Sequence, residues 1–213
     1  MKDDMAGAAA TLGIMRAVAE LALPIRVIGI VAATENLPGG RALKPGDVVR
    51  SLGGLTIEII STDAEGRLVL ADALGYAARF QPQAVVDLAT LTGGCVVALG
   101  NIAAGLMGTD QALIDELRQA ADQSGELAWQ LPLYAQYAEQ IKSDVADVKN
   151  SGGRGASAIT AGKFLERFAE GYPWAHLDIA GLAWADDTKG YVPRGATGYG
   201  VRLLVSWLRN HEA

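Results

Sequence analysis

Short apolar runs alternate along this chain with longer segments whose apolar positions recur at helical spacing. The runs Ile25 to Ala33 and Ala84 to Ala89 have the pattern of strands that are buried on both faces of a sheet. A helix is predicted between Asp4, which can cap it, and Pro24, which ends it. The further predicted helices are 68–80, 111–123, 133–141, 157–169 and 200–210, and the further predicted strands are a hairpin in 48–60 around Gly53-Gly54, 96–107 and 174–180.

This alternation of buried strands and helices predicts an α/β protein. We expect a three-layer α/β/α sandwich around a mixed, largely parallel sheet. The length of 213 residues, half of them apolar and 26 of them glycine, suits a compact domain with many tight turns. No long linker, internal repeat or low-complexity segment interrupts it, so a single domain over residues 1–213 is expected.

Charge and cysteine content exclude several classes of protein. The net charge is −6 and lysines and arginines are scattered, which disfavours binding to nucleic acid or to an anionic membrane surface. Cys95 is the only cysteine, so an internal disulfide and a cysteine zinc site are excluded, and its apolar surroundings predict a buried, unreactive thiol. Asp3 and Asp4 stand where a signal peptide would be basic, and no apolar run is long enough to span a membrane. We therefore expect a soluble, cytoplasmic protein.

Candidate chemistry is concentrated in Asp63, Glu65 and Arg67, at alternate positions between a predicted strand and a predicted helix. In an extended backbone these three side chains would project to the same side. Two carboxylates with an adjacent guanidinium can form a divalent-metal site with an anion-binding partner. The alternative is a solvated turn whose aspartate caps the following helix.

The residues around Asp63, Glu65 and Arg67 distinguish the metal site from the solvated, helix-capping turn. The stretch STDAEGRLVLADAL, residues 61–74, resembles the signature of the leucyl aminopeptidase (cytosol aminopeptidase) family, with Ser61 where that signature usually has asparagine. Five further blocks are similar to family blocks and occur in the family's order: 1–10, 35–41, 44–47, 87–93 and 176–181. The resemblance covers essentially the whole chain. It implies a zinc-peptidase-like fold and a metal-dependent hydrolase, an aminopeptidase that releases N-terminal residues, preferably leucine-like ones, from peptides.

The resemblance also implies the ligands of a two-metal centre of Mn²⁺ or Zn²⁺. Glu65 would bridge the two ions, Asp63 would complete one site, and Asp4 would contribute to the other. Taken alone, Asp4 at the start of a helix would be a cap. Arg67 would bind a bicarbonate-like anion that acts as general base, for which its planar fork of donors is suited.

Substrate-binding residues follow from the same resemblance. Thr90, Leu91 and Gly93 come directly after a predicted buried strand, at the end of a sheet where α/β proteins bind ligands. Ala180 and Ala183 match positions that line the pocket for the N-terminal side chain. Ordinary packing is the alternative for these small residues. The family's metal ligands do not include a match to His176, so we expect His176 and Asp178 to form a buried hydrogen-bonding pair. The family further implies a homo-hexamer.

One departure from the family concerns a segment, Lys-Gly-x-x-x-Asp-Ser-Gly-Gly, that does not occur among these residues. In the family it precedes the block matched by Lys2 to Met5 and supplies a lysine ligand and a second bridging aspartate, with a catalytic lysine close by. We therefore expect the C-terminal part of a catalytic domain, incomplete at its N-terminal end, with an exposed sheet edge. Three carboxylates can hold one divalent ion but not the complete pair. The competing hypothesis is a catalytically inactive fragment that acts as an assembly or binding subunit. A weaker one is a single-metal phosphohydrolase built on Asp63 and Glu65.

Overall fold

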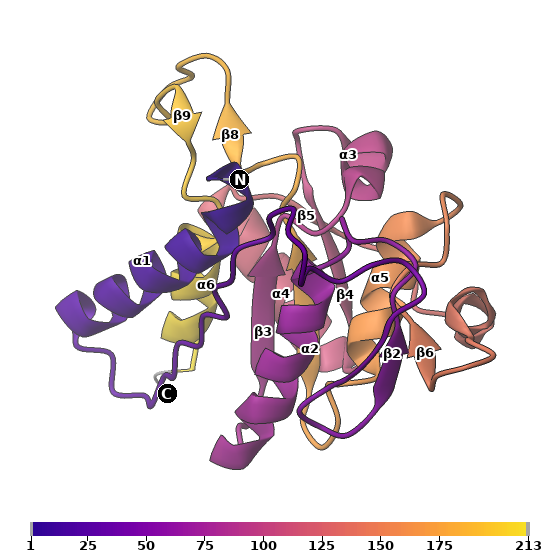
Figure 1. Cartoon of the computed structure of the whole chain (residues 1–213). Coiled ribbons are helices and arrows are strands. Elements are labelled where there is room, and N and C mark those ends of the chain that lie inside the picture. Colours follow the sequence, from indigo (N-terminus) through magenta and orange to yellow (C-terminus); the bar gives the residue numbers. More distant parts are fainter. Residues whose placement is uncertain (1, 212–213) are drawn as a thin grey trace.

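A four-stranded sheet forms the centre of the molecule, in a computed structural model that describes residues 2–211 (Figure 1). Its strands lie in the order β3 (Val85–Ala89), β7 (Trp174–Asp178), β4 (Ala104–Gly108) and β5 (Ala128–Gln130). The pairs β3–β7 and β4–β5 are parallel, whereas β4 and β7 are antiparallel. The central sheet is therefore mixed, as the sequence predicts.

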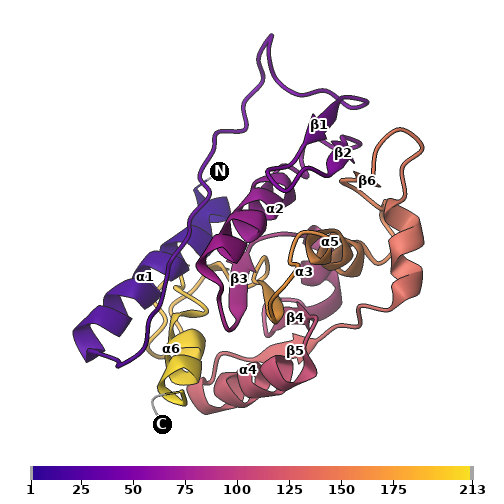
Figure 2. The ribbon, with the colours of Figure 1, turned by 90° about the horizontal axis from the view of Figure 1, so that it is seen from below.

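Helices cover both faces of this sheet (Figure 2). On one face lie α1 (Ala6–Leu21), α4 (Gln111–Ser124) and α6 (Val201–Arg209), whose apolar side chains share a core with β3, β4 and β7. On the other face α2 (Gly66–Ala77) and α5 (Ser157–Glu166) enclose a second core that includes Trp174. The short helix α3 (Gly93–Leu99) follows β3 directly. The predicted mixed α/β class is confirmed, with helices on both sides of the sheet.

The remaining strands form two separate small sheets. The strands β1 (Val48–Arg50), β2 (Thr56–Glu58) and β6 (Val148–Lys149) form one, and β8 (Trp184–Ala185) and β9 (Gly195–Ala196) form the other. The 3₁₀ helices are η1 (Asp3–Met5), η2 (Ala78–Phe80) and η3 (Ala135–Ile141). The predicted hairpin around Gly53-Gly54 is present as β1 and β2. The expectation of one sheet is wrong for residues 2–211, because β2 pairs with β6 and not with the central strands.

Two predicted strands are wrong. Residues 25–33 are extended but belong to no strand, and Arg26, Ile28 and Val31 are exposed, because no strand among residues 2–211 pairs with them. The predicted strand 96–107 is instead the end of α3 followed by β4. Thr92 caps α3 by accepting a hydrogen bond from the Cys95 amide at 3.0 Å. A helix therefore begins where the apolar residues alone indicate a strand.

Glycine at position 7 allows α1 to lie directly against β3. A Cβ atom there would lie 2.1 Å from the Leu88 carbonyl oxygen, a distance that no side chain can occupy. This close approach places the N-terminal end of α1, and Asp4 just before it, beside the carboxyl end of β3. Within residues 2–211, helices long and apolar enough to cross a membrane are absent.

Candidate active site

The segment from Asp63 to Arg67 connects β2 to α2, and one buried side chain determines its shape. The Asn150 carboxamide oxygen accepts hydrogen bonds from the amides of Ile60 (2.8 Å) and Ser61 (3.2 Å). Its NH₂ group donates to the carbonyls of Ser61 (2.7 Å) and Ala64 (3.3 Å). Asn150 was not predicted to be a site residue. Its only signal in the sequence is its place before the glycine loop at Gly152-Gly153.

The expectation of an extended backbone at this segment is wrong. Glu65 already has helical dihedral angles (φ −75°, ψ −34°), and Arg67 lies in the first turn of α2. Residues two apart in a helix do not share a face. The three side chains are brought to one cavity by the turn into α2 and by Asn150, and not by strand periodicity.

Arg67 is buried, and its guanidinium is only partly satisfied. Its Nη1 donates to the Asn150 carbonyl at 2.8 Å, while its Nε is buried without a partner in the structure. Burial lowers the pKa of Arg67 to about 10, and the nearby carboxylates of Asp178 and Glu65 oppose that shift. One carboxylate oxygen of Glu65, Oε2, is also buried and unpartnered. A buried donor and a buried acceptor thus remain free for a ligand at this site.

Asp4 and Thr90 meet although they lie far apart in the sequence. The Thr90 hydroxyl donates to Asp4 Oδ1 at 2.6 Å. Asp4 lies in η1 and Thr90 in the loop after β3, so this contact joins a predicted metal ligand to a predicted substrate-binding residue.

Asp178 anchors the two loops that leave β3 and β7. Its Oδ1 accepts from the amides of Leu91 (3.1 Å), Thr92 (3.4 Å) and Ala180 (3.2 Å), and its Oδ2 accepts from the Thr92 hydroxyl at 2.7 Å. Asp178 is completely buried, as expected. Its role in shaping the site is one that the sequence pattern does not show.

His176 is buried as predicted, but the predicted pairing with Asp178 is wrong, because the partner of His176 is Asp87 on the neighbouring strand. Its Nδ1 lies 2.6 Å from Asp87 Oδ1, and Asp87 Oδ2 accepts from the indole of Trp174 at 2.7 Å. Asp87 is opposite His176 in the parallel register of β3 and β7, so the cross-strand neighbour becomes the partner.

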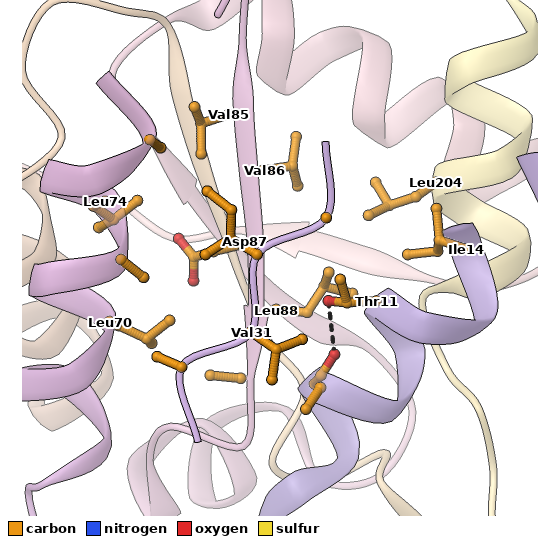
Figure 3. Close-up of a pocket in the computed structure, with 18 of the residues that line it drawn as sticks. Thr11, Ile14, Val31, Leu70, Leu74, Val85, Val86, Asp87, Leu88 and Leu204 are labelled. Carbon is orange, nitrogen blue, oxygen red and sulfur yellow. Dashed lines mark hydrogen bonds between the residues drawn. The ribbon is translucent and has the colours of Figure 1, made fainter. Parts of the chain in front are cut away.

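A cavity of about 1140 Å³ lies between α1, α2, β3 and the extended segment at residues 25–31. Figure 3 shows side chains from α1, α2 and β3 facing it, together with Val31 of the extended segment. The predicted site residues that line it are Asp4, Asp63, Glu65, Arg67, Thr90, Leu91 and Gly93. Ala180 and Ala183 do not line it. Ala183 is buried, and Ala180 is held at its amide by Asp178.

The donor set at this cavity suits a divalent cation. Asp4, Asp63 and Glu65 offer hard carboxylate oxygens, and Glu65 Oε2 has no other partner. Between residues 2 and 211, however, the structure holds no three acidic, histidine or cysteine side chains already converged on one ion position. The three carboxylates have the chemistry and the location that a divalent cation requires, but they do not form the complete ligand sphere by themselves.

A mixed α/β fold with three carboxylates and an arginine lining one cavity is an arrangement that suits a domain binding a divalent cation. The pattern of the cytosol aminopeptidase family, catalytic domain, matches residues 1–205, and the chain belongs to that family. The membership expected from the sequence blocks is confirmed.

Curated relatives and solved structures agree with this membership. A probable cytosol aminopeptidase of Geobacter sulfurreducens is 59% identical over 209 residues, which are 98% of this chain and 42% of the relative. The bottromycin maturation enzyme BotP has a TM-score of 0.96 at 45% identity, over 100% of this chain and 48% of BotP, and it is also known in complex with Mn. A mutant tomato leucine aminopeptidase has a TM-score of 0.90 at 43% identity, over 99% of this chain and 41% of its own. The chain thus spans less than half the length of these proteins.

Proposed function

We propose that these residues form the C-terminal part of the catalytic domain of a metal-dependent aminopeptidase that releases N-terminal residues, leucine-like ones preferably, from peptides. The observation that carries the proposal is that Asp4, Asp63, Glu65 and Arg67, which match the family blocks, line one cavity although Asp4 is distant in sequence. The Mn complex of BotP supports manganese as one suitable metal, and zinc is the alternative.

In this proposal Asp4, Asp63 and Glu65 would contribute, together with ligands from outside these residues, to holding two divalent ions in the complete protein. Bound ions would polarise the scissile carbonyl and lower the pKa of a water. Arg67 would hold a bicarbonate-like anion, which would supply a general base next to that water. Its unpartnered Nε and its attachment to Asn150 through Nη1 support a fixed, inward-facing donor.

The loop that carries Thr90, Leu91 and Gly93 orients the peptide. Its support is the Asp178 carboxylate, which fixes the Leu91 amide so that the adjacent backbone groups keep one position relative to Glu65. Ala180 and Ala183 line the pocket for the N-terminal side chain in this proposal, and the anchoring of Ala180 by the same carboxylate supports its place beside that loop.

Assembly and location are further parts of the proposal. A homo-hexamer is supported by family membership, and a cytoplasmic location by the name of the relatives, cytosol aminopeptidase. The competing proposal is a catalytically inactive fragment that acts as an assembly or binding subunit. It is supported by the incomplete ligand sphere within residues 2–211.

The test is hydrolysis of a leucyl amide, with added Mn²⁺ or Zn²⁺, by the protein produced from the complete gene. We expect turnover, and Arg67→Lys should lower kcat by about 10² or more, because a lysine cannot reproduce the guanidinium fork. Arg16→Lys is the matched control, since Arg16 is exposed on α1 and pairs with the exposed Glu20. A folded protein without turnover would exclude the aminopeptidase. Cleavage of a phosphate ester instead would favour the phosphohydrolase.

The DNA upstream of the Met1 codon separates the enzyme from the fragment. An in-frame segment that encodes Lys-Gly-x-x-x-Asp-Ser-Gly-Gly supplies the remaining ligands and favours the enzyme. A stop codon followed by a genuine initiation site favours the inactive fragment.

A further inference from the structure

A row of buried polar side chains leads along β7 to the candidate site. Successive residues of a strand face opposite sides of the sheet, so Trp174, His176 and Asp178 share one face of β7. Trp174 packs on that face in the core that α2 and α5 enclose. His176 and Asp178 are both 0% exposed, and Asp178 ends the strand, where it accepts hydrogen bonds from the Leu91 and Ala180 amides. His176 is therefore the next side chain inward from the residue that anchors the loops of the site.

The helix α2 brings Arg67 to these side chains. The buried residues of α2 form one stripe at helical spacing, namely Arg67, Ala71, Leu74 and Ala77. The Tyr172 hydroxyl donates to the Leu74 carbonyl at 2.7 Å, which ties this stripe to the chain just before β7. Arg67 precedes Leu74 by about two turns, so its guanidinium lies beside the other end of β7. The charges agree with this placement, because burial lowers the pKa of Arg67, the Asp178 carboxylate opposes that shift, and the Arg67 charge acts on His176 in turn.

His176 is fixed through one ring nitrogen, and its other nitrogen has no partner in the structure. Nδ1 lies 2.6 Å from Asp87 Oδ1, and the indole of Trp174 donates to Asp87 Oδ2 at 2.7 Å, so the carboxylate is held from two sides. Figure 3 shows the Asp87 side chain between β3 and α2. The atoms His176 Nε2, Arg67 Nε and Glu65 Oε2 are three of the four buried side-chain polar atoms that lack a partner among residues 2–211. Buried polar atoms in this state mark a place where a bound group can complete the hydrogen bonds.

The proton on His176 sets the charge of this polar row, which consists of Asp87, His176, Asp178 and Arg67. Glu65 adds a third carboxylate, whose charge acts on the Arg67 guanidinium. The strand β4 places the uncharged Met107 opposite His176, and the charged residues of α5, Lys163 and Glu166, pair with each other. Three carboxylates therefore face one permanent cation, and a protonated His176 supplies a second. Burial and the Arg67 charge disfavour that proton, but the carboxylates of Asp87 and Asp178 outweigh both and raise the pKa of His176.

We propose that His176, held by Asp87, is a positioning residue for the anion site at Arg67, and that its protonated form favours the bound anion whereas its neutral form releases it. The inference rests on the anion-binding role proposed for Arg67, and it adds a pH-sensitive control to that role. Charges that are shielded from water act on each other over several ångströms. With a neutral His176, the three carboxylates repel an anion and draw the guanidinium towards themselves. Because linkage is reciprocal, a bound anion must then raise the pKa of His176.

The test is nuclear magnetic resonance of the 213-residue chain labelled with ¹⁵N-histidine. The chain has two histidines, so His211 serves as an internal control, exposed and paired with Glu116. Formate is the probe, because it is planar like bicarbonate and keeps a single negative charge from about pH 6 to about pH 9. At an ionic strength held constant with chloride, saturating formate should raise the pKa of His176 by at least about half a pH unit. This corresponds to at least about threefold tighter binding to the protonated form, and the pKa of His211 should not change.

Two variants separate the anion site from the titrating group. Arg67→Gln removes the donor of the anion site, so the pKa of His176 should no longer respond to formate, whereas Arg16→Gln, at an exposed position of α1, should keep the response. In His176→Gln, the formate affinity should lose its dependence on pH and should equal that of the wild type at high pH. His211→Gln is the matched control and should retain the pH dependence. The affinity is measured from the Leu91 amide signal, which lies in the loop of the site.

Several outcomes would overturn the inference. One is a His176 pKa that formate leaves unchanged while the Leu91 amide reports binding, and another is the absence of formate binding at every pH. An undiminished response in Arg67→Gln would place the anion elsewhere and would overturn it as well. The wild-type titration leaves the buried pair intact, so it decides the outcome should His176→Gln or Arg67→Gln fail to fold, as judged by circular dichroism. Turnover of the leucyl amide is measured separately, so an inactive protein with an intact formate response would contradict the peptidase and not this inference.

Discussion

Buried polar side chains away from the predicted ligands determine the geometry of this site. Asn150 holds the loop of Asp63, and Asp178 holds the loop of Leu91. Each satisfies several backbone groups at once, so removal of either side chain would leave several buried donors or acceptors without partners. The positions of the candidate catalytic and metal-binding residues therefore depend on residues that would not touch the substrate.

The pair formed by His176 and Asp87 predicts a pH-dependent stability. Burial alone would lower the pKa of His176, but the contacting Asp87 carboxylate and the nearby Asp178 outweigh burial and the opposing Arg67, so the pKa is raised. A raised folded-state pKa stabilises the fold fully below the unfolded-state value of about 6.5, and this stability is lost as pH rises through the folded-state pKa.

Urea unfolding should therefore give a smaller free energy of unfolding at pH 8 than at pH 6, and His176→Gln should reduce that difference. Burial and the neighbouring Asp178 raise the pKa of the Cys95 thiol to about 12, so it stays neutral in the fold, and partial ionisation of the unfolded-state thiol adds only a small loss of stability near pH 8. An unchanged pH difference in His176→Gln would contradict the prediction.

At the scale of elements, the position of α1 depends on one glycine. Gly7→Ala should destabilise the fold by roughly 1–3 kcal/mol, because the added methyl group would overlap the Leu88 carbonyl and force α1 away from β3. Helix propensity alone would favour alanine by about 1 kcal/mol. Gly75→Ala in α2 is the matched control, since its methyl group would make only an ordinary contact at 3.8 Å, and it should stabilise. Urea unfolding of both variants measures the contrast, and equal effects would contradict the argument.

Most elements could be predicted from the sequence because their signals are local. The helices α1 and α4 and the strands β3 and β7 agree with the apolar spacing and the turn residues. The run at 25–33 was wrongly predicted to be a strand, since a strand requires a partner and periodicity says nothing about whether one is available. The start of α3 was not predicted, because the residues after Thr92 are apolar and indicate a strand. The family blocks indicated candidate ligands that line the cavity, but not the loop anchors Asn150 and Asp178.

At the scale of the whole molecule, we expect these 213 residues to bind one divalent ion weakly and to show no appreciable peptidase activity. Two dications placed against Asp4, Asp63 and Glu65 alone would repel each other strongly at short separation. Titration calorimetry with Mn²⁺, paired with a leucyl amide assay, should give single occupancy that Asp63→Asn weakens. Asp144→Asn, at an exposed position outside the cavity, should have no effect. Two tight sites with turnover would contradict this expectation.

The hydrogen bonds of the Asp178 carboxylate limit how the shape of such a site can change during evolution. It ties the loops after β3 and β7 to one rigid point, so neither loop can shift independently of the other. If the proposed function is correct, a change in preference for the N-terminal side chain would come from exchanging individual side chains on loops that keep their positions. Displacing either loop would move Leu91 and Ala180 together, which in the proposed aminopeptidase would change catalysis and selectivity at the same time.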